Sequence, residues 1–574
     1  MAGANIDDAL DRVSELPESI LHHILSFLPV KDAARTSILS KRWEGVWDTL
    51  PYLDFYLDFF DTKISSTEGK RRHFQQLLES ANKIILSRCQ HIASIEKLRL
   101  WIPDISAEQW LHTNKPLDVT IERLISYVAH TALKELYFTN SNACFAGLLN
   151  LPCTILSAKS LNVLSLYRFD LRTLSSSLDV KFPSLSKLYL GRVFLEDDIM
   201  GKLIVGCPSL EDLKLYDCQG LKTIYLTGLP KLKQFVVLFI QVELIVIEAP
   251  KLQVLEVLDP SPLCQVIVAT CSSLSEVRLY GEFIEEQWLH HFISQCLFLE
   301  KLMLSMGSRI QGNEVRENVA RISSYSLKNL IFFSRNLKVE ITAPNLKKLC
   351  FESYDDLLPT ISLNASDLLE VELELRRGRG ISGDWRHLLA KFLGPFNHFN
   401  TVKLRGDVLL RPAKAIISPE ENRLSLLSPL CGTRNLIFSA STMEFEAVEL
   451  VEYMFWLSPR ATTLSIGYKD NEYINKTYAV LKLRYGENVH KDSLCPLCKF
   501  NDCWHKVLLE VTFEKFEGGE DERRKMEDFF LKHVKDLKIV RGSCNVLNPG
   551  LAESGTHMTC LQEGHKGSKL QKIQ

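Results

Sequence analysis

The sequence predicts a mixed α/β protein, in which three short N-terminal helices precede a long curved solenoid and a small α/β unit closes the C-terminal end. Three observations predict this fold class. Apolar residues fall at helical spacing between residues 17 and 47, a short strand motif returns many times between residues 95 and 373, and a strand, a glycine turn and a charged helix follow near residue 507. At 574 residues the chain exceeds the roughly 250–300 residues at which a single core stops growing, so several domains or one repeat array are expected.

Composition excludes several function classes. Lysine and arginine (68) nearly balance aspartate and glutamate (70), so no global field draws in nucleic acid or an anionic membrane. The first twelve residues lack the apolar core of a signal peptide, and the longest apolar run, residues 235–247, is broken by Gln241 and Glu243. The fifteen cysteines are scattered singly among apolar residues, which favours reduced, buried thiols. We therefore expect a soluble protein of the cytoplasm, the nucleus or both.

Residues 16–47 predict three consecutive helices. Pro17 and Glu18 suit the first turn of a helix whose apolar stripe runs to Leu28, where Pro29 ends it. Asp32 opens a second helical run that continues to Ser40, and a third helix follows. About forty residues form only a marginal core, so the remaining apolar surface must be covered. Two coverings are open: a partner protein, or the downstream solenoid with the module acting as its cap.

The pattern of these helices resembles an F-box. The residues that carry the resemblance are Leu16-Pro17, Ile20-Leu21-x-x-Ile24-Leu25, Leu28-Pro29-Val30-Lys31 and Ser40-Lys41-Arg42-Trp43-x-x-x-Trp47, within a module at residues 10–55. The resemblance implies binding to the Skp-type adaptor of an SCF-type cullin-RING ubiquitin ligase, and through it to the cullin and RING subunits. The adaptor-binding residues, some of which also supply the module's own core, are then Leu16, Pro17, Ile20, Leu21, Ile24, Leu25, Leu28, Pro29, Val30, Lys31, Trp43 and Trp47.

A Leu-x-x-Leu-x-Leu motif returns along the middle of the chain. Copies begin at Ile95, Leu133, Leu161, Leu185, Leu210, Leu252, Leu274, Leu299, Leu346 and Leu369. Most are about 19 to 31 residues apart, the range of leucine-rich repeats. Each copy predicts one short strand that cannot bury its apolar face alone, so neighbours stack into a curved solenoid. These look like the repeats of plant-type F-box proteins, which implies a right-handed solenoid.

The boundaries follow from these patterns. Residues 56–90 form a linker or helical cap, residues 91–410 the solenoid, and residues 411–480 degenerate terminal repeats. The leucines of the motif are core, so target recognition falls to the non-leucine positions of the strands on the concave side. These positions are chemically mixed, which favours a protein or peptide target over a polyanion. The target-binding candidates are Arg99, Tyr137, Tyr189, Lys214, Arg278 and Met303, with Ser165, Glu256 and Glu372 at equivalent positions.

The C-terminal region changes character near Leu481. Residues 507–513 predict a strand, Gly518 and Gly519 a turn, residues 522–534 a helix and residues 537–540 a closing strand. This order resembles the FBD domain that follows F-box and leucine-rich repeats in many plant proteins. The resemblance implies that residues 481–545 cap the open edge of the solenoid, and residues 546–574 are expected to form a disordered tail.

One cluster in this region has the donor types of a structural zinc site: Cys495, Cys498, Cys503 and His505. The two-residue step from Cys503 to His505 is short for tetrahedral closure, and no second C-x-x-C pair follows, so reduced thiols near a turn are favoured over zinc. We expect no other cofactor.

No nucleotide-binding loop, nucleophile elbow or zinc-protease motif is present in the sequence, so we expect a non-catalytic protein. The reading that the resemblance implies is a substrate-recognition subunit of an SCF-type ligase, whose target is a protein that the sequence does not identify. Two alternatives stay open: a stand-alone leucine-rich-repeat interaction scaffold, and a co-receptor in which a hormone-like small molecule assists target binding. A zinc-dependent nucleic-acid binder is disfavoured by the balanced charge.

Overall fold

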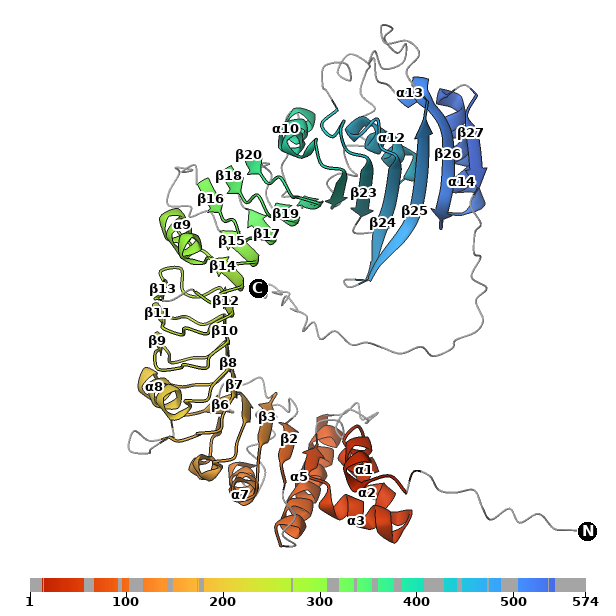
Figure 1. Cartoon of the computed structure of the whole chain (residues 1–574). Helices are drawn as coiled ribbons and strands as arrows, with labels where there is room; N and C mark the ends of the chain where they lie inside the picture. The colour runs from red at the N-terminus through yellow and green to blue at the C-terminus, as the bar shows by residue number, and fades with distance from the viewer. Residues whose placement is uncertain are drawn as a thin grey trace, which may run out of the picture.

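The computed structural model describes most of the chain. The described residues are 13, 15–55, 67–90, 95–102, 117–141, 148–172, 174, 180–269, 272–306, 319–334, 338–353, 360–375, 385–406, 428–440, 446–471, 474–486, 504–534 and 536–541. Figure 1 shows a helical N-terminal module at one end of an arc of strands and a broad antiparallel region at the other end. The tail expected at residues 546–574 lies outside the described residues.

The N-terminal module contains the three expected helical runs. They are α1 (Glu18–Leu25), α2 (Val30–Arg35) continued by the 3₁₀ turn η1 (Thr36–Ile38), and α3 (Lys41–Thr49). Helix α2 begins two residues before the expected Asp32, because Pro29 takes an extended conformation and serves as the N-cap residue. Ser40 caps α3 by accepting a hydrogen bond from the Trp43 backbone N–H at 3.3 Å.

A short strand and a long helix join the module to the rest of the chain. Strand β1 (Tyr52–Asp54) pairs in parallel with β2 (Lys97–Ile102), so the module continues directly into the main sheet. Helix α5 (Thr67–Gln90) places Leu78, Ala81 and Ile85 in the same buried cluster as Val30 of the module. The segment expected to be a linker or cap is therefore largely one helix packed between module and solenoid.

Over the described ranges the main sheet has 19 strands, and it forms the inner face of the arc. After β2 its parallel strands follow in chain order, which is the arrangement expected when each repeat contributes one strand. They are β3 (Glu135–Asn140), β5 (Val163–Tyr167), β7 (Lys187–Gly191), β8 (Asp212–Tyr216), β10 (Gln234–Leu238), β12 (Val254–Leu258), β14 (Glu276–Gly281), β15 (Lys301–Met306), β17 (Asn329–Ser334), β19 (Lys348–Ser353), β21 (Glu370–Leu375), β22 (Thr401–Arg405), β23 (Asn435–Ala440) and β24 (Thr463–Asn471).

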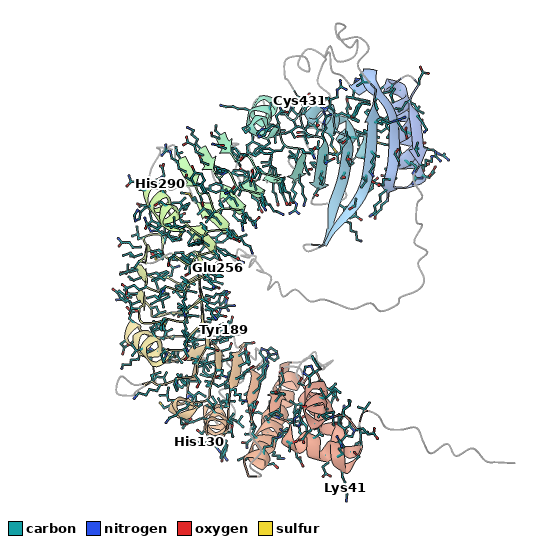
Figure 2. The ribbon with its side chains drawn as sticks, viewed as in Figure 1. Lys41, His130, Tyr189, Glu256, His290 and Cys431 are labelled. Atoms are coloured by element: carbon teal, nitrogen blue, oxygen red, sulfur yellow. The ribbon has the colours of Figure 1, made fainter. Side chains whose placement is uncertain are left out.

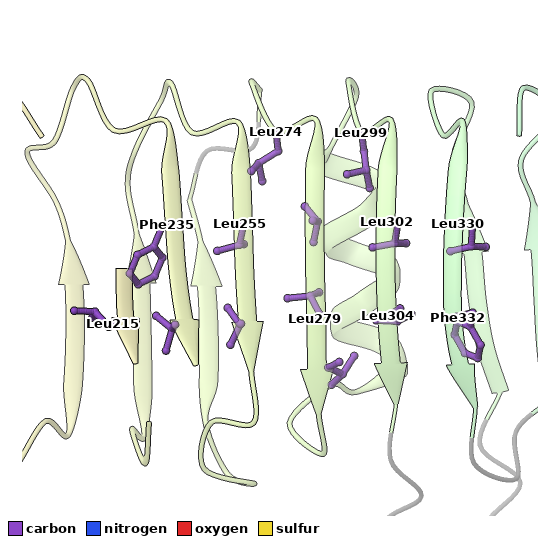
Figure 3. Close-up of a cluster of buried hydrophobic side chains, with 14 of the residues drawn as sticks. Leu215, Phe235, Leu255, Leu274, Leu279, Leu299, Leu302, Leu304, Leu330 and Phe332 are labelled. Atoms are coloured by element: carbon purple, nitrogen blue, oxygen red, sulfur yellow. The ribbon is translucent and has the colours of Figure 1, made fainter. Parts of the chain in front are cut away.

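The motif leucines hold the repeats together because the strands stay in register. Leu213 of β8 is paired with Phe235 of β10, which is paired with Leu255 of β12, and all three side chains are fully buried. Figure 3 shows such residues lying between the inner strands and the outer layer. Successive side chains of a strand point to opposite faces. In β8, for example, Leu213 and Leu215 are buried, so Lys214 between them lies on the open inner face.

The outer layer is made of helices and two small parallel sheets. The helices are α7 (Leu117–Ala129), α8 (Asp197–Gly206), α9 (Glu286–Gln295), α10 (Trp385–Leu393) and α12 (Ala447–Leu457), with 3₁₀ turns η3 (Cys153–Ser157) and η4 (Gly394–Phe396). The sheets are β9 (Thr223–Leu226) with β11 (Leu244–Ile247) and β13 (Gln265–Val268), and β16 (Val319–Ser323) with β18 (Lys338–Thr342) and β20 (Thr360–Asn364). A further pair is β4 (Leu149–Asn150) with β6 (Phe169–Asp170). The described strands and helices of this layer cover the apolar back of the inner sheet.

The structure corrects the repeat pattern at four places, one of which is β22, an inner strand for which no motif copy was predicted. Strands β10 and β17 are repeats that the motif search missed, because Val236 and Ile331 stand where other repeats mostly have a polar residue, so the apolar alternation is lost. The copy expected to begin at Leu369 is wrong by one residue: Leu368 is buried, whereas Leu369 is 70% exposed.

The C-terminal unit extends the same sheet. Strand β25 (Ile474–Tyr485) turns back antiparallel to β24, β26 (Leu508–Phe516) is antiparallel to β25, and β27 (Lys538–Arg541) is parallel to β26. Helices α13 (Trp504–Val507) and α14 (Glu520–His533) accompany them. The expected strand, glycine turn, helix and closing strand are thus present, but the change of direction begins at β25, before the expected Leu481.

The described cysteines differ in their exposure to solvent. None of them forms a disulfide; Cys153 and Cys431 are exposed, whereas Cys207, Cys218 and Cys264 are buried. Burial raises the pKa of Cys207 to about 12 and that of Cys264 to about 11. The thiolate is the reactive form, so these buried thiols have almost none of it near pH 8. We expect maleimide labelling followed by mass spectrometry to modify Cys153 and Cys431 first, with the buried cysteines labelled only after denaturation; early labelling of Cys207 would contradict this.

Candidate functional site

The N-terminal module has a small core of its own. It consists of Leu21, Leu25, Ala33, Trp43, Val46 and Leu50, with Leu16, Leu28 and Trp47 packed partly buried against it. Of the residues that the sequence assigned to partner binding, Leu21, Leu25, Val30 and Trp43 are buried. Leu21, Leu25 and Trp43 belong to this core, whereas Val30 packs into the larger cluster shared with α5 and the solenoid. Pro17, Ile20, Ile24 and Lys31 are exposed, and Leu16, Leu28, Pro29 and Trp47 are half-buried.

Large apolar side chains stand exposed on this module. Ile20 and Ile24 lie one helical turn apart on α1, and Phe27 follows directly after the helix with 69% of its surface exposed. Ile38 and Leu39, at the end of η1, are 84% and 66% exposed. Exposed apolar groups of this size mark protein interaction sites more often than scattered single residues do. The sequence pattern had missed Phe27, Ile38 and Leu39, because they fall outside the helical stripe that it used.

Polar contacts hold the exposed side chains on a rigid support. Thr49 of α3 donates a hydrogen bond to the Glu18 carboxylate of α1 at 2.5 Å. Arg42 of α3 donates to the Leu16 carbonyl at 2.6 Å, which ties down the entry into α1. Both ends of α3, at Arg42 and at Thr49, are therefore hydrogen-bonded to the start of α1 or to Leu16 shortly before it. A rigid surface loses less conformational entropy on binding.

Helix α3 contains a glycine with open space around it. Gly45 is exposed in the middle of the helix, and a Cβ placed on it meets no atom within 4 Å. Glycine at such a site is less favourable than alanine by about 0.5–1 kcal/mol. We expect Gly45→Ala to slow hydrogen exchange of the α3 amides by roughly two- to fivefold, a rise in local stability measurable by mass spectrometry. Unchanged or faster exchange would contradict the open geometry.

A buried arginine joins the module to helix α5. Arg88 is 5% exposed, its guanidinium donates hydrogen bonds to the Leu50 and Trp47 carbonyls, and its Cζ lies 4.6 Å from the centre of the Trp47 ring. Desolvation by burial lowers the pKa of Arg88 to about 10, against the opposing effect of the Asp48 carboxylate. The Trp47 carbonyl also accepts the Leu50 backbone N–H, at 3.2 Å, whereas for the Leu50 carbonyl Arg88 is the donor at this end of the module.

The inner face of the solenoid presents a continuous row of side chains. Each candidate predicted for target binding lies at the same register position of its strand: Arg99 is paired with Tyr137, Tyr189 with Lys214, and Arg278 with Met303. Figure 2 shows Tyr189 and Glu256 on the inner side of the arc, and His130 and His290 on its outer side. The structure therefore brings these candidates onto one face.

Most of the polar candidates are paired with their neighbours on that face. Arg99 contacts Asp54 at 3.2 Å, and the Tyr189 hydroxyl donates to Asp212 at 2.6 Å. Arg278 bridges Glu256 and Glu276, at 3.2 and 2.5 Å. Burial raises the pKa of Tyr137 to about 12, helped by Glu135, whose carboxylate accepts its hydrogen bond. A ligand that recruits these groups must replace contacts they already make.

A second row of side chains lies on the inner face, two positions after the target-binding candidates in each strand. This row was not predicted from the sequence. It carries aromatic residues in several repeats, namely Trp101, Tyr167, Tyr216, Tyr280 and Phe333. All five are half-buried, and the Tyr280 and Phe333 ring centres lie 5.6 Å apart. The signal was present in the sequence, because these aromatic residues directly follow the last apolar residue of the motif.

The cysteine and histidine cluster proposed for zinc lies mostly outside the described residues. Cys495, Cys498 and Cys503 are not among them, and His505 stacks on Trp504 with ring centres 3.9 Å apart. Residue His533 of α14 lies near His505, with ring centres 5.6 Å apart. Within the described ranges no three His, Cys, Asp or Glu side chains are placed to hold a metal ion. In the same ranges no helix has the length and apolar character to cross a membrane.

Two family models match the chain. Residues 13–54 match the F-box domain, and residues 121–271 match the repeats described as "FBD-associated F-box protein At5g56370, LRR repeats". The first range contains α1 to β1, and the second runs from within α7 to just past β13. An F-box followed by leucine-rich repeats is therefore confirmed for these parts of the chain.

Curated relatives from Arabidopsis thaliana have the F-box and leucine-rich repeats in their names, and two of the three described here also have the FBD. The chain is 34% identical over 206 residues to "Putative F-box/FBD/LRR-repeat protein At4g00315", an alignment that covers 36% of this chain and 42% of the relative. It is 29% identical to "F-box/FBD/LRR-repeat protein At4g26340", over 44% of this chain and 55% of the relative. It is 26% identical to "F-box/LRR-repeat protein At3g03360", over 52% and 57%. The alignments thus span about half the length of these relatives, and the resemblance to plant F-box/leucine-rich-repeat proteins is confirmed.

Proposed function

We propose that this F-box and leucine-rich-repeat chain is a non-catalytic substrate receptor of an SCF-type cullin-RING ubiquitin ligase. The F-box binds a Skp-type adaptor, which connects the chain to the cullin and RING subunits. The inner face of the solenoid binds the target protein. The role requires no cofactor of its own, and we assign it to the cytoplasm, the nucleus or both.

The observation that carries the proposal is the set of exposed apolar residues on the F-box: Ile20, Ile24, Phe27, Ile38 and Leu39. The module has a core of its own and still exposes large apolar side chains to water. Such an exposed apolar surface is typical of a protein-binding site. The model match over residues 13–54 identifies the type of module, and such modules bind Skp-type adaptors. The alternative that the module only caps the solenoid is less well supported, because the cap contact is made by Val30, Trp47 and Arg88, away from these exposed residues.

The shape of the molecule supports a receptor role. The F-box lies at one end of the arc and the repeat face opens along its inner side (Figure 1). A target held on that face is tethered to the ligase, so its lysines are at a high effective concentration near the charged ubiquitin carrier. The chain itself supplies binding and orientation only.

The direct test is a binding measurement between the purified full chain and a purified plant Skp-type adaptor. We expect a one-to-one complex with a dissociation constant below about 1 μM in isothermal titration calorimetry, as is typical of stable interfaces built around apolar anchors. The negative heat-capacity change of binding reports the apolar surface that is buried. Absence of binding by a folded chain would overturn the proposal and favour a stand-alone repeat scaffold.

A further inference from the structure

Two arginines stand at the ends of neighbouring inner strands in the left-handed conformation that Asp217, Phe239 and Asp259 also take after β8, β10 and β12. Arg168 follows β5 with φ +62°, and Arg192 follows β7 with φ +50°. Their backbone N–H groups are held by the Gly191 and Tyr216 carbonyls, at 2.8 and 2.7 Å. Because left-handed residues other than glycine are uncommon, a fold that needed only this conformation would be served better by glycine or asparagine. The conformation alone therefore does not explain arginine at both positions.

An aromatic ring lies between these repeats and borders both guanidinium groups. The Cζ atoms of Arg168 and Arg192 each lie 5.9 Å from the centre of the Tyr167 ring, and Arg192 is also 6.0 Å from the Tyr216 ring. The ring needs the glycine of the next strand, since a Cβ on Gly191 would stand 2.5 Å from Tyr167 Cδ2. Tyr167 is thus seated on Gly191, which fixes the position of the aromatic ring relative to the two arginines.

The pair has more positive charge than its neighbours neutralise. Arg192 contacts the Asp217 carboxylate at 2.9 Å, and both side chains remain 36% exposed. Arg168 donates to the Ser141 carbonyl at 3.2 Å, and no ion pair joins it to a described carboxylate. Among the described residues, the two guanidinium groups therefore have one ion-pair partner, Asp217, and it contacts Arg192 alone. Each guanidinium has five N–H donors, so both keep donors for a further acceptor.

The surrounding inner face has the same sign of charge. We define the N-terminal concave surface as the outward positions of β1, β2, β3, β5, β7 and β8, together with the residue that follows each of the last three strands. Its charged side chains are six cationic, Lys97, Arg99, Arg168, Lys187, Arg192 and Lys214, and four anionic, Asp54, Glu135, Asp212 and Asp217. This surplus of positive charge stands on a chain whose net charge is −2.

We propose that the N-terminal concave surface docks an acidic segment of the target polypeptide, with carboxylates bound by Arg168 and Arg192 and an apolar side chain packed against Tyr167 and Tyr216. Arginine forms paired hydrogen bonds with carboxylates, and aromatic and arginine side chains dominate interface energies. The charge surplus favours an acidic occupant over a neutral or basic one and speeds its association. This inference rests on the proposed function, since it specifies the target class of the same receptor.

The test uses a phage-displayed library of random twelve-residue peptides selected on the full chain bound to its adaptor. We expect the enriched peptides to be rich in Asp and Glu with at least one aromatic or aliphatic residue. Synthetic copies should bind the Arg168→Glu/Arg192→Glu variant at least about tenfold more weakly for each arginine reversed, because a hydrogen bond to a charged group is worth about a factor of ten or more. The Arg168→Lys/Arg192→Lys variant keeps the positive charge but cannot form the paired hydrogen bonds of a guanidinium with a carboxylate, so its loss of peptide affinity should be intermediate.

The matched control is Lys231→Glu/Lys251→Glu, which changes the net charge equally at two exposed turn positions of later repeats. It should leave peptide affinity within about twofold, since surface charges at that distance are largely screened. Enrichment of neutral or basic peptides, or equal binding by the arginine variant and the control, would overturn the inference. Adaptor binding is recorded in the same samples: its loss counts against the proposed function, whereas retained adaptor binding without acidic selectivity counts against this inference alone.

Discussion

Replacing Ile20 and Ile24 together by aspartate is expected to weaken adaptor binding by about 100-fold or more while the chain stays folded. Both side chains are exposed on α1, 44% and 38%, so the new carboxylates remain in water in the free protein. In the complex each carboxylate would be buried against an apolar partner surface without a counter-charge, and apolar anchors at the centre of an interface are each worth about 2 kcal/mol or more. Calorimetry with the purified adaptor measures the loss.

Two controls make this result interpretable. Leu21 lies between the two isoleucines in the sequence but has no exposed surface, so Leu21→Asp places a carboxylate in the core of the F-box and should unfold the module. Lys231→Glu changes the net charge by the same amount on an exposed turn of the solenoid and should leave adaptor affinity unchanged. If the double aspartate variant bound the adaptor like the original chain, α1 would not be the contact surface.

Replacing Arg88 by alanine is expected to loosen the F-box from the solenoid by about 3 kcal/mol. The substitution leaves the Leu50 and Trp47 carbonyls without the guanidinium that they share, and removes the packing of that group over the Trp47 ring. The buried Leu50 carbonyl is left unsatisfied, which costs about 1–3 kcal/mol, whereas the Trp47 carbonyl keeps the Leu50 backbone N–H. Loss of the contact with the Trp47 ring adds about 1 kcal/mol. Hydrogen exchange of α3 and of the end of α5 should become roughly 100-fold faster, while exchange in the central strands stays unchanged.

Lys83→Ala is the control for the Arg88 variant. Lys83 is an exposed residue of the same helix, so its removal should change stability by less than about 0.5 kcal/mol. Arg88→Lys should lie between the two, because one ammonium cannot reproduce both hydrogen bonds and the ring contact. Equal exchange in the Arg88→Ala variant and the original chain would show that the junction depends on the apolar cluster around Val30 and Leu78 instead.

The element types were predictable from local chemistry. Pro17 and Pro29 precede α1 and α2, Ser40 caps α3, and the motif leucines mark most of the inner strands, so each of these elements is encoded within a few residues. The exposed apolar groups of the F-box were only half predictable. Helical spacing groups Leu21 with Ile20 and Leu25 with Ile24, and only the packing of α1 against α3 decides which member of each pair is buried.

The inner face shows the same limit. The strand motif predicts which position faces outward, and the register confirms it, but the motif does not say how outward residues pair with one another across strands. The ion pairs Arg99–Asp54 and Arg278–Glu256 join neighbouring strands, with partners 45 and 22 residues apart in sequence. The contact of Tyr167 with Gly191 joins two successive repeats. Contacts of this kind depend on the exact stacking of repeats, which degenerate spacing obscures.

The most direct test of the central claim is affinity capture of the full chain from plant cells treated with a proteasome inhibitor, compared with capture of the Ile20→Asp/Ile24→Asp variant. The account predicts that a Skp-type adaptor and a cullin are recovered with the original chain and lost from the variant, while a target bound to the solenoid is recovered with both. If the original, folded chain recovered neither adaptor nor cullin, or if the variant recovered them equally, the assignment as an SCF substrate receptor would be contradicted.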